Sequence, residues 1–306
     1  MTSFLIRRIF AAVFVLLCLT AIIFLLVYVA GDPISIMMAG TGMSQEELSA
    51  FKEELGLDKP LYFQYLDFLK GLFKGELGDS IFFGSPAAPI IMSRLPATAK
   101  LAAVSFTIAL IVSVPIGIVS ALKVNTFVDY FARSLALVGQ AVPYFWLAIM
   151  GIMFFAVKLQ ILPSSGIGSF RHYVLPSITL ATFPIARLVR ITRSAMLDVI
   201  HQDYITTARA KGVRESLIFF KHAFKNASIS VITMSGLLIG ELLGGSVIIE
   251  TVFAWPGTGR LAVQAVNARD FPLLQGIVFV IALAYLTANL VVDIIYGFLD
   301  PRIVYD

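Results

Sequence analysis

The chain contains six apolar runs, each about as long as a membrane is thick, and these runs constrain its fold more than any other feature. An α-helix needs roughly 20 apolar residues to cross the hydrocarbon core of a bilayer. Backbone groups in lipid must bond within a helix or a closed barrel, so such runs predict an all-α membrane protein with six transmembrane helices. The predicted spans are residues 9–30, 98–122, 131–157, 173–189, 229–253 and 273–299.

The composition excludes a soluble protein. Of the 306 residues, 58% are hydrophobic and 14% are charged, whereas a soluble domain carries about 25% charged residues. The basic residues behind the net charge of +4 cluster in loops between the apolar runs, which indicates membrane orientation rather than nucleic-acid binding. The single Cys18 lies in an apolar run, so no disulfide framework exists.

The first apolar run is expected to remain in the mature protein. It follows Arg7 and Arg8, and it is longer than the apolar region of about 7–15 residues that a signal peptide carries. Residues 1–30 are therefore predicted to form an uncleaved transmembrane helix.

Residues 31–94 are predicted to form a small external segment that is mainly helical. The segment holds nine Asp/Glu and five Lys/Arg, which is too polar for lipid. Ser44 and Glu47 have the spacing of a helix N-cap with a capping box. Residues 61–73 show a second amphipathic helical pattern.

Four prolines lie inside predicted spans. Proline in a spanning helix is tolerated where neighbouring helices satisfy the freed backbone groups, so these positions indicate bent helices packed in a bundle. They are Pro115, Pro143, Pro176 and Pro184.

The distribution of Lys and Arg predicts the orientation. Residues 187–225 alone hold eight Lys/Arg and three Asp/Glu, and under an alternating six-span topology they lie on the same side as both termini. Cytoplasmic loops carry the excess of basic residues. Both termini and this basic stretch are therefore expected in the cytoplasm, and residues 31–94 outside.

Residues 203–226 form a basic, helix-compatible island between two apolar runs. Ala208 and Gly212 are four residues apart, so on a continuous helix they would share one face. Small residues on one face let another protein surface approach the backbone. The alternative interpretation is an ordinary basic cytoplasmic loop.

The sequence Thr-Thr-Ala-Arg-Ala-Lys-Gly at residues 206–212 resembles the "EAA" loop of ABC-importer permeases, the loop that docks on the ATPase subunit. It is most similar to the dipeptide/oligopeptide/nickel branch of that family. Ala208 and Gly212 match the motif, whereas Thr206-Thr207 replaces its usual Glu-Ala. The resemblance assigns ATPase docking to Tyr204, Thr206, Thr207, Ala208, Arg209, Ala210, Lys211 and Gly212.

Further stretches resemble the same branch in the same order along the chain. They are residues 31–33, 54–60, 250–260, 269–272, 289–293 and 300–302.

The resemblance implies an ABC-importer type I permease fold in the bacterial inner membrane. It implies a permease domain at residues 95–299, with the docking loop at 196–226, and a cytoplasmic tail at 300–306. It also implies several partners: a second, similar permease in a heterodimer, two ATPase subunits that use ATP and Mg²⁺, and an external solute-binding protein. The chain itself is expected to carry no cofactor and to move a peptide-like solute.

Glu241 lies near the middle of the fifth predicted span, beside Gly240, Gly244 and Gly245. A carboxylate in a span is costly unless it faces the bundle interior, a water-filled path or a partner. We hypothesise that Glu241 faces the translocation path and favours cargo with a positive group. The alternative is a protonated side chain that makes one interhelical hydrogen bond.

A Trp-Pro-Gly turn follows the fifth predicted span. Trp255 and Tyr173 fall where an interfacial aromatic belt is expected. The turn is either a gate, a contact for the binding protein or a structural turn. Its candidate gate residues are Glu250, Trp255, Pro256 and Gly257.

Catalytic motifs are absent from the sequence. No Gly-x-x-x-x-Gly-Lys-Ser/Thr loop occurs, so the chain is not expected to be an enzyme and ATP hydrolysis is assigned to separate subunits. His172, His201 and His222 lack metal-ligand spacing. An ion-coupled secondary transporter or channel is the alternative function, and it would need a relay of charges inside the membrane. An integral-membrane enzyme would need paired catalytic groups at membrane depth, and the sequence shows none.

The orientation is testable with single cysteines in a Cys18→Ser background. A membrane-impermeant thiol reagent should label Ser49→Cys from outside and Ser216→Cys from the cytoplasm, because the basic loops lie inside. Labelling of both variants from the same side would contradict the six-span topology.

Overall fold

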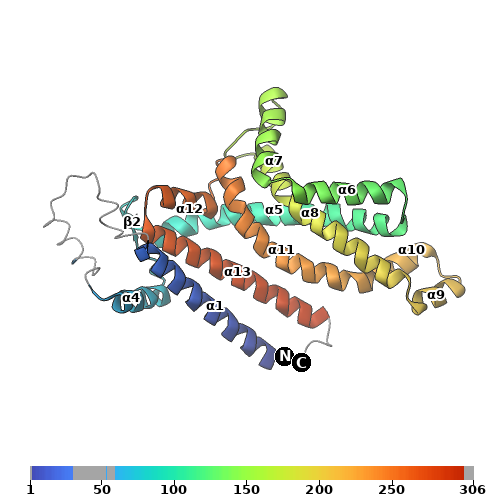
Figure 1. The fold of residues 1–306 in the computed structure, drawn as a ribbon, viewed down its shortest axis with the longest axis horizontal. Helices are drawn as coiled ribbons and strands as arrows, with labels where there is room; N and C mark the ends of the chain where they lie inside the picture. The colour runs from blue at the N-terminus through green and yellow to red at the C-terminus, as the bar shows by residue number, and fades with distance from the viewer. Residues whose placement is uncertain (1, 30–52, 54–58, 300–306) are drawn as a thin grey trace. The chain divides into compact units, whose positions relative to one another are not determined.

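The computed structural model describes residues 2–29, 53 and 59–299 of the chain (Figure 1). The predicted N-cap at Ser44 and the tail at 300–306 lie outside these residues. The chain divides into two compact units. We call Ala99–Trp255 with the segment from Thr287 onward the core unit, and Ile6–Thr98 with Pro256–Leu286 the flanking unit.

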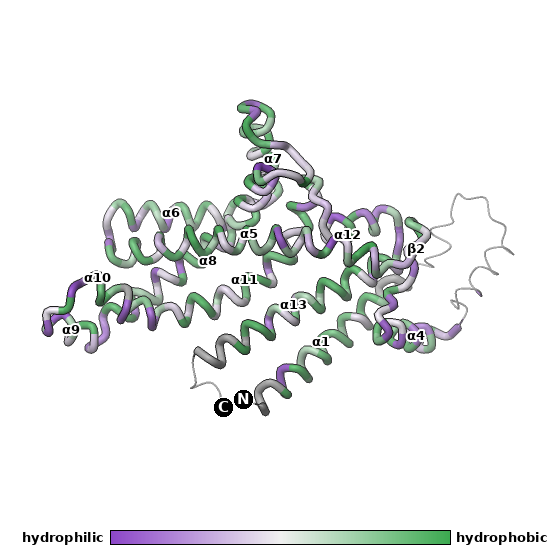
Figure 2. The backbone as a smooth tube through the Cα atoms, turned by 180° about the vertical axis from the view of Figure 1, so that it is seen from behind, coloured by the Kyte–Doolittle hydropathy of each residue, from purple (hydrophilic) through white to green (hydrophobic). Residues whose placement is uncertain are grey.

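Five described helices are long and apolar enough to cross a membrane, and a bent pair of helices makes six if it is counted as one span. The predicted all-α membrane fold is therefore confirmed. Figure 2 shows hydrophobic residues along most of these helices and more hydrophilic residues at α9 and α12. The five helices are α1 (Thr2–Val29), α5 (Ala87–Leu122), α8 (Arg171–Ile200), α11 (Phe224–Val252) and α13 (Phe271–Leu299).

The third predicted span is wrong as a single helix. The structure has α6 (Phe127–Ala141) and α7 (Tyr144–Gly151), and the chain bends by 101° between them. Proline has no backbone N–H and disfavours helical geometry in the residue before it. Val142 is accordingly extended, at φ −87° and ψ 124°, directly before Pro143. Beyond α7 the chain continues as a π-helix, η1 (Ile152–Lys158).

Helix α8 is longer than the predicted fourth span and contains both Pro176 and Pro184 in its interior. It also carries Arg187, Arg190 and Arg193, the first three basic residues of the stretch at 187–225. The predicted island at 203–226 follows this helix. It consists of α9 (Asp203–Ala210), α10 (Glu215–Leu217), the π-helix η2 (Ile218–Ala223) and the first residues of α11.

The flanking unit contains the described part of the predicted external segment. The amphipathic pattern at 61–73 is confirmed as α4 (Leu61–Lys74), whose Tyr65 ring lies 5.4 Å from the Phe24 ring of α1. Strands β1 (Asp79–Ser80) and β2 (Ser85–Pro86) form a short antiparallel pair. Together with α12 (Thr258–Asn267), α5 and α13 they surround a core of Leu77, Ile91, Leu261, Leu273 and Ile277.

Glycine allows two helices of the core unit to approach closely. A Cβ built on Gly117 of α5 would lie 2.5 Å from Thr192 Cβ and 3.0 Å from the Val189 carbonyl oxygen, both in α8. Real side chains do not tolerate such a contact. Membrane helices approach this closely only where a small residue removes the side chain from between them. Packing of α5 against α8 therefore depends on Gly117.

Gly117→Ala should lower the stability of the protein in detergent. The extra methyl overpacks the α5–α8 contact, which typically costs about 1–3 kcal/mol, and this exceeds the gain of up to about 1 kcal/mol in helix propensity. The matched control is Gly244→Ala, because a Cβ at Gly244 would meet nothing within 4 Å. Thermal unfolding measures both. A Gly117→Ala variant as stable as the control would contradict this packing argument.

Candidate functional site

The island after α8 is built around a short, firmly anchored helix. At eight residues α9 is too short to be stable alone, since isolated helices shorter than about 12–15 residues are marginal in water. Its Ile205 is fully buried against Ile118 of α5, Met196 of α8 and Ile218 of η2. Burial of such a side chain stabilises by about 1.5–3 kcal/mol. Figure 1 shows α9 and α10 at the end of the core unit where α8 ends and α11 begins.

Gly212 ends this helix, so the expected shared face with Ala208 is wrong. Gly212 has φ +73°, a left-handed conformation that favours glycine. Its N–H donates to the Arg209 carbonyl at 2.9 Å, and the Val213 N–H donates to the Ala208 carbonyl at 3.2 Å. These two bonds are those of a Schellman C-cap, and the usual apolar contact accompanies them: Ala208 and Val213 both pack on the cluster that holds Ile205.

The outward face of α9 is small and polar. Thr206, Thr207 and Ala210 are exposed, whereas Ala208 is half-buried. The small exposed surface of α9 is therefore formed by Thr206, Thr207 and Ala210, whereas the helical spacing had suggested Ala208 and Gly212.

The remaining predicted docking residues surround this face. Tyr204 is 41% exposed, and its hydroxyl accepts a hydrogen bond from Asn226 Nδ2 at 2.7 Å. Arg209 Nε donates to Glu215 Oε1 at 3.0 Å, and Lys211 is exposed. All eight predicted docking residues thus lie in α9 or its C-cap, and their role in docking stays a prediction.

A buried carboxylate ties the turn between α5 and α6 to α8. Asp129 is fully buried, and Arg193 donates to its two oxygens from Nε at 2.7 Å and from Nη2 at 3.0 Å. Ser120 Oγ donates to the same carboxylate at 2.6 Å, and the Asn125 backbone N–H at 3.0 Å. Such bidentate, charge-assisted bonds fix geometry as well as adding energy. We call this group the Asp129 clamp.

The clamp adjoins the apolar cluster that anchors α9. Ser120 is next to Ala121 on α5, and Arg193 is two residues before Ala195 on α8; both alanines belong to that cluster. A displacement of α9 is therefore applied to helices that the clamp holds together. Asp129 was not predicted from the sequence, because its partner lies 64 residues away. Its only local signal is an acidic residue in the first turn of a helix.

The structure gives Glu241 a partner that the sequence did not reveal. Arg187 Nη1 of α8 donates to Glu241 Oε1 of α11, and the two form an ion pair. The side chains are 31% and 44% exposed, respectively. The contact is interhelical, as the alternative interpretation expected, and its partner is a cationic guanidinium.

The Trp-Pro-Gly turn is internal rather than lipid-facing. Trp255 is fully buried, and its ring packs edge-on against Tyr173 at 4.7 Å, so the expected aromatic belt is wrong for Trp255. The backbone N–H of Trp255 donates to the backbone carbonyl of Glu250 at 2.8 Å. Glu250 and Gly257 are buried as well, and Pro256 is half-buried. This geometry favours the structural-turn interpretation, and a role as gate or binding-protein contact stays a prediction.

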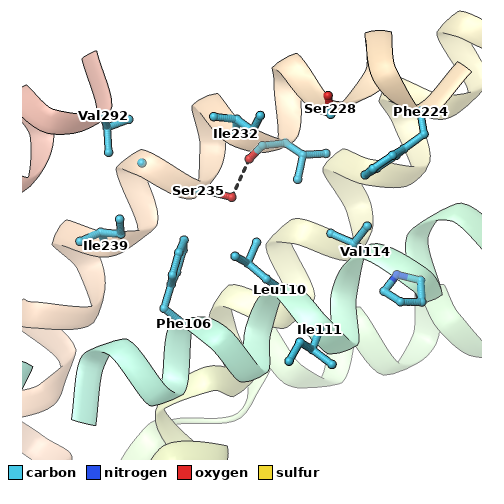
Figure 3. A pocket seen from close by; sticks show the side chains of 13 residues that line it. Phe106, Leu110, Ile111, Val114, Phe224, Ser228, Ile232, Ser235, Ile239 and Val292 are labelled. Atoms are coloured by element: carbon cyan, nitrogen blue, oxygen red, sulfur yellow. Dashed lines mark hydrogen bonds between the residues drawn. The ribbon is translucent and has the colours of Figure 1, made fainter. Parts of the chain in front are cut away.

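An apolar groove of about 760 Å³ lies between α5 and α11 in the core unit (Figure 3). Phe106, Leu110, Phe224 and Ile232 line it, and no charged residue does. Its Ser235 hydroxyl already donates to the Val231 carbonyl at 2.7 Å. The groove therefore offers nothing to hold a charged or strongly polar solute. Among the described residues, no group of three or more His, Cys, Asp or Glu is placed to hold a metal ion.

Comparison with known protein families covers nearly the whole chain. Residues 113–305 match the family described as binding-protein-dependent transport system inner membrane component. Residues 1–102 match the N-terminal part of the corresponding membrane component.

Curated relatives match along their full length. The oligopeptide transport system permease protein AppB of Bacillus subtilis is 39% identical over 317 aligned residues, with 100% of both chains covered. The dipeptide transport system permease protein DppB of Escherichia coli K12 is 36% identical over 335 aligned residues, with 99% of both chains covered.

Solved structures share the fold. An inward-facing structure of the MetNI methionine ABC transporter has a TM-score of 0.60 at 16% identity and covers 69% of this chain and 96% of its own. A crystal structure of an amino acid ABC transporter has a TM-score of 0.53 at 18% identity and covers 70% and 94%, respectively.

Loss of the Asp129 clamp should destabilise the protein strongly. Asp129→Ala leaves Arg193 without its buried counter-charge, and breaking a buried pair in this way costs about 3–5 kcal/mol. The control is Asp67→Ala, which removes an exposed pair with Lys70 and should cost no more than about 1 kcal/mol. Thermal unfolding in detergent compares the two. Equal stability of both variants would show that the clamp does not hold α6 and α8 together.

Proposed function

This chain belongs to the family of binding-protein-dependent transport system inner membrane components, and we propose that it is the peptide-translocating permease subunit of an ATP-driven ABC importer. The family and the membrane helices support a multi-pass inner-membrane protein. The full-length relatives named as oligopeptide and dipeptide permeases support a peptide-like cargo. ATP hydrolysis takes place in other subunits, which use ATP and Mg²⁺.

The observation that carries the coupling mechanism is the structure of α9. A docking element must accept force from another protein without deforming, and it must expose a surface that a partner can approach closely. The buried Ile205 and the C-cap at Gly212 meet the first need. The small outward side chains Thr206, Thr207 and Ala210 meet the second.

In this proposal, ATP-driven closure of the ATPase subunits moves α9. Ile205 passes the displacement to the ends of α5, α8 and α11 that its apolar cluster joins. The Asp129 clamp makes α6 follow α8. A packed helix bundle responds to such a push by switching between two arrangements rather than by bending continuously, which suits alternation between inward-open and outward-open states.

The assembly proposed around the chain has four further subunits in three roles. A second, similar permease completes the translocation path, two ATPase subunits bind the two docking helices, and an external solute-binding protein delivers cargo. Both termini and α9 lie in the cytoplasm, and residues 31–94 lie outside, as the basic loops indicate.

The alternative, an ion-coupled transporter or channel, has less support. Such a mechanism needs intramembrane carboxylates that exchange ions. Glu241 is instead neutralised by Arg187. The full-length relatives are permeases of peptide transport systems, which favours the importer.

Docking is testable at Ala210. Ala210→Glu adds bulk and charge to the small outward face of α9 and should abolish co-purification of the ATPase subunits, since a close contact cannot accommodate a buried unpaired carboxylate. Ala210→Ser keeps the side chain small and should retain the ATPase subunits at the level of the unmodified protein. Affinity purification from membranes, with quantification of each subunit, measures both.

Abundance of the permease in the membrane serves as the folding control, because Ala210 is exposed and contributes little to packing. Full retention of ATPase subunits by Ala210→Glu would refute docking on this face. Substitution of Gly212 is a weaker test. Its left-handed backbone strains any side chain by roughly 1–2 kcal/mol and would disturb the C-cap together with the contact.

A further inference from the structure

A face of the core unit carries charges at the depth of the spanning helices. Arg187 lies near the middle of α8 and Glu241 near the middle of α11, and both side chains of the pair remain partly exposed. An isolated charge at the centre of a bilayer costs at least about 2.5–3.5 kcal/mol, and such residues turn toward a bundle interior or a water-filled cavity. This face is therefore unsuited to lipid.

The same face holds a second cation. Arg190 is one helical turn beyond Arg187 on α8 and is exposed, and among the described residues it makes no ion pair or hydrogen bond. Two guanidinium groups thus accompany one carboxylate. The cluster has a surplus positive charge, which attracts an anionic group in addition to the cation that Glu241 can hold.

The surroundings leave room beside the pair. Glu241 and Gly244 are three residues apart on α11 and share its exposed face, and a Cβ at Gly244 would meet nothing within 4 Å. The Phe183 ring lies 5.4 Å from Arg187 Cζ, so the guanidinium is held over an aromatic face. Tyr144 packs 6.2 Å from Phe183 and so adds a second ring to the site.

We propose that Arg187, Arg190 and Glu241 form a transient binding station for the charged termini of a zwitterionic peptide. The peptide carboxylate binds Arg187 and Arg190, and the peptide ammonium binds Glu241. The inference rests on the proposed function and names the chemical class of cargo that this part of the path recognises.

The resting ion pair explains how the station releases its cargo. Without cargo, Arg187 and Glu241 neutralise each other, so neither charge is left uncompensated. A peptide replaces this one pair by two new pairs and sheds part of its own hydration. The free energy gained from the two new pairs is nearly offset by the loss of the resting pair and of hydration. Peptide binding is therefore weak enough for release, as a translocation path requires. A cargo with a single charge would leave one member of the pair without a partner.

The first test probes Gly244→Cys in a Cys18→Ser background, in the complete importer purified into lipid nanodiscs. Charged, water-soluble methanethiosulfonate reagents should modify this variant, because the station faces water. Free tri-alanine should slow the reaction at least about fivefold, whereas N-acetyl-tri-alanine amide, which has no terminal charges, should not. The control is Ile111→Cys on α5, which lines the apolar groove and is 68% exposed, and it should remain unmodified because no charged residue lines that groove.

The second test uses Arg187→Gln and Glu241→Gln in the Gly244→Cys background. Arg187→Gln should lower the ratio of modification rates by anionic and cationic reagents by about tenfold or more, and Glu241→Gln should raise it, since nearby charges act strongly where water is restricted. Each variant should also abolish the protection by tri-alanine while the ATPase subunits still co-purify.

Two outcomes would overturn the proposal. Failure of Gly244→Cys to react, as for Ile111→Cys, would mean that lipid or the second permease covers this face. Equal protection by free and blocked tri-alanine, or protection by neither, would mean that terminal charges are not recognised. Neither outcome would affect the proposed function, which fails instead if the ATPase subunits do not bind α9 and the importer shows no ATP-dependent uptake.

Discussion

The free-energy cost of an uncompensated charge within packed spanning helices governs the arrangement of the core unit. Arg193 reaches Asp129 with two hydrogen bonds, and Arg187 reaches Glu241 across to α11. Each pair joins two helices. Because each charge needs its partner nearby, each pair also fixes how its two helices pack. The two pairs differ in exposure, since Asp129 is fully buried whereas Glu241 is 44% exposed. The buried pair is suited to holding helices together, and the partly exposed pair is suited to exchange with a solute.

These constraints connect the proposed docking surface to the membrane helices. Helix α9 is short and would not persist alone, and its stability comes from a side chain inserted among α5, α8 and η2. In the proposed mechanism, the contact that stabilises α9 also transmits its displacement. The clamp at Asp129 lies next to this contact along both α5 and α8, so it ties the turn that begins α6 to the same helices. The proposed coupling thus depends on the same few residues that stabilise α9.

Glycine, which has no side chain, and proline, which has no backbone N–H, set the helix geometry of the core unit. Pro143 separates α6 from α7 and produces a 101° bend, whereas Pro176 and Pro184 lie within a continuous α8. The difference lies in the residue before Pro143, which is extended. Gly117 removes the side chain that would separate α5 from α8. Close packing and a sharp bend therefore come from specific positions rather than from general flexibility.

The sequence by itself determined the class of fold, most of the spans and the amphipathic helix at 61–73. Hydropathy, helical periodicity and turn residues are local properties, so they can be read from residues that are close together in the sequence. Tertiary structure decided which residues share a surface. Arg187 and Glu241 are 54 residues apart, and Asp129 and Arg193 are 64 apart, so no local pattern could pair them. Gly212 shows the same limit over a few residues: its spacing from Ala208 suggested one helical face, but its left-handed backbone ends the helix before that face can form.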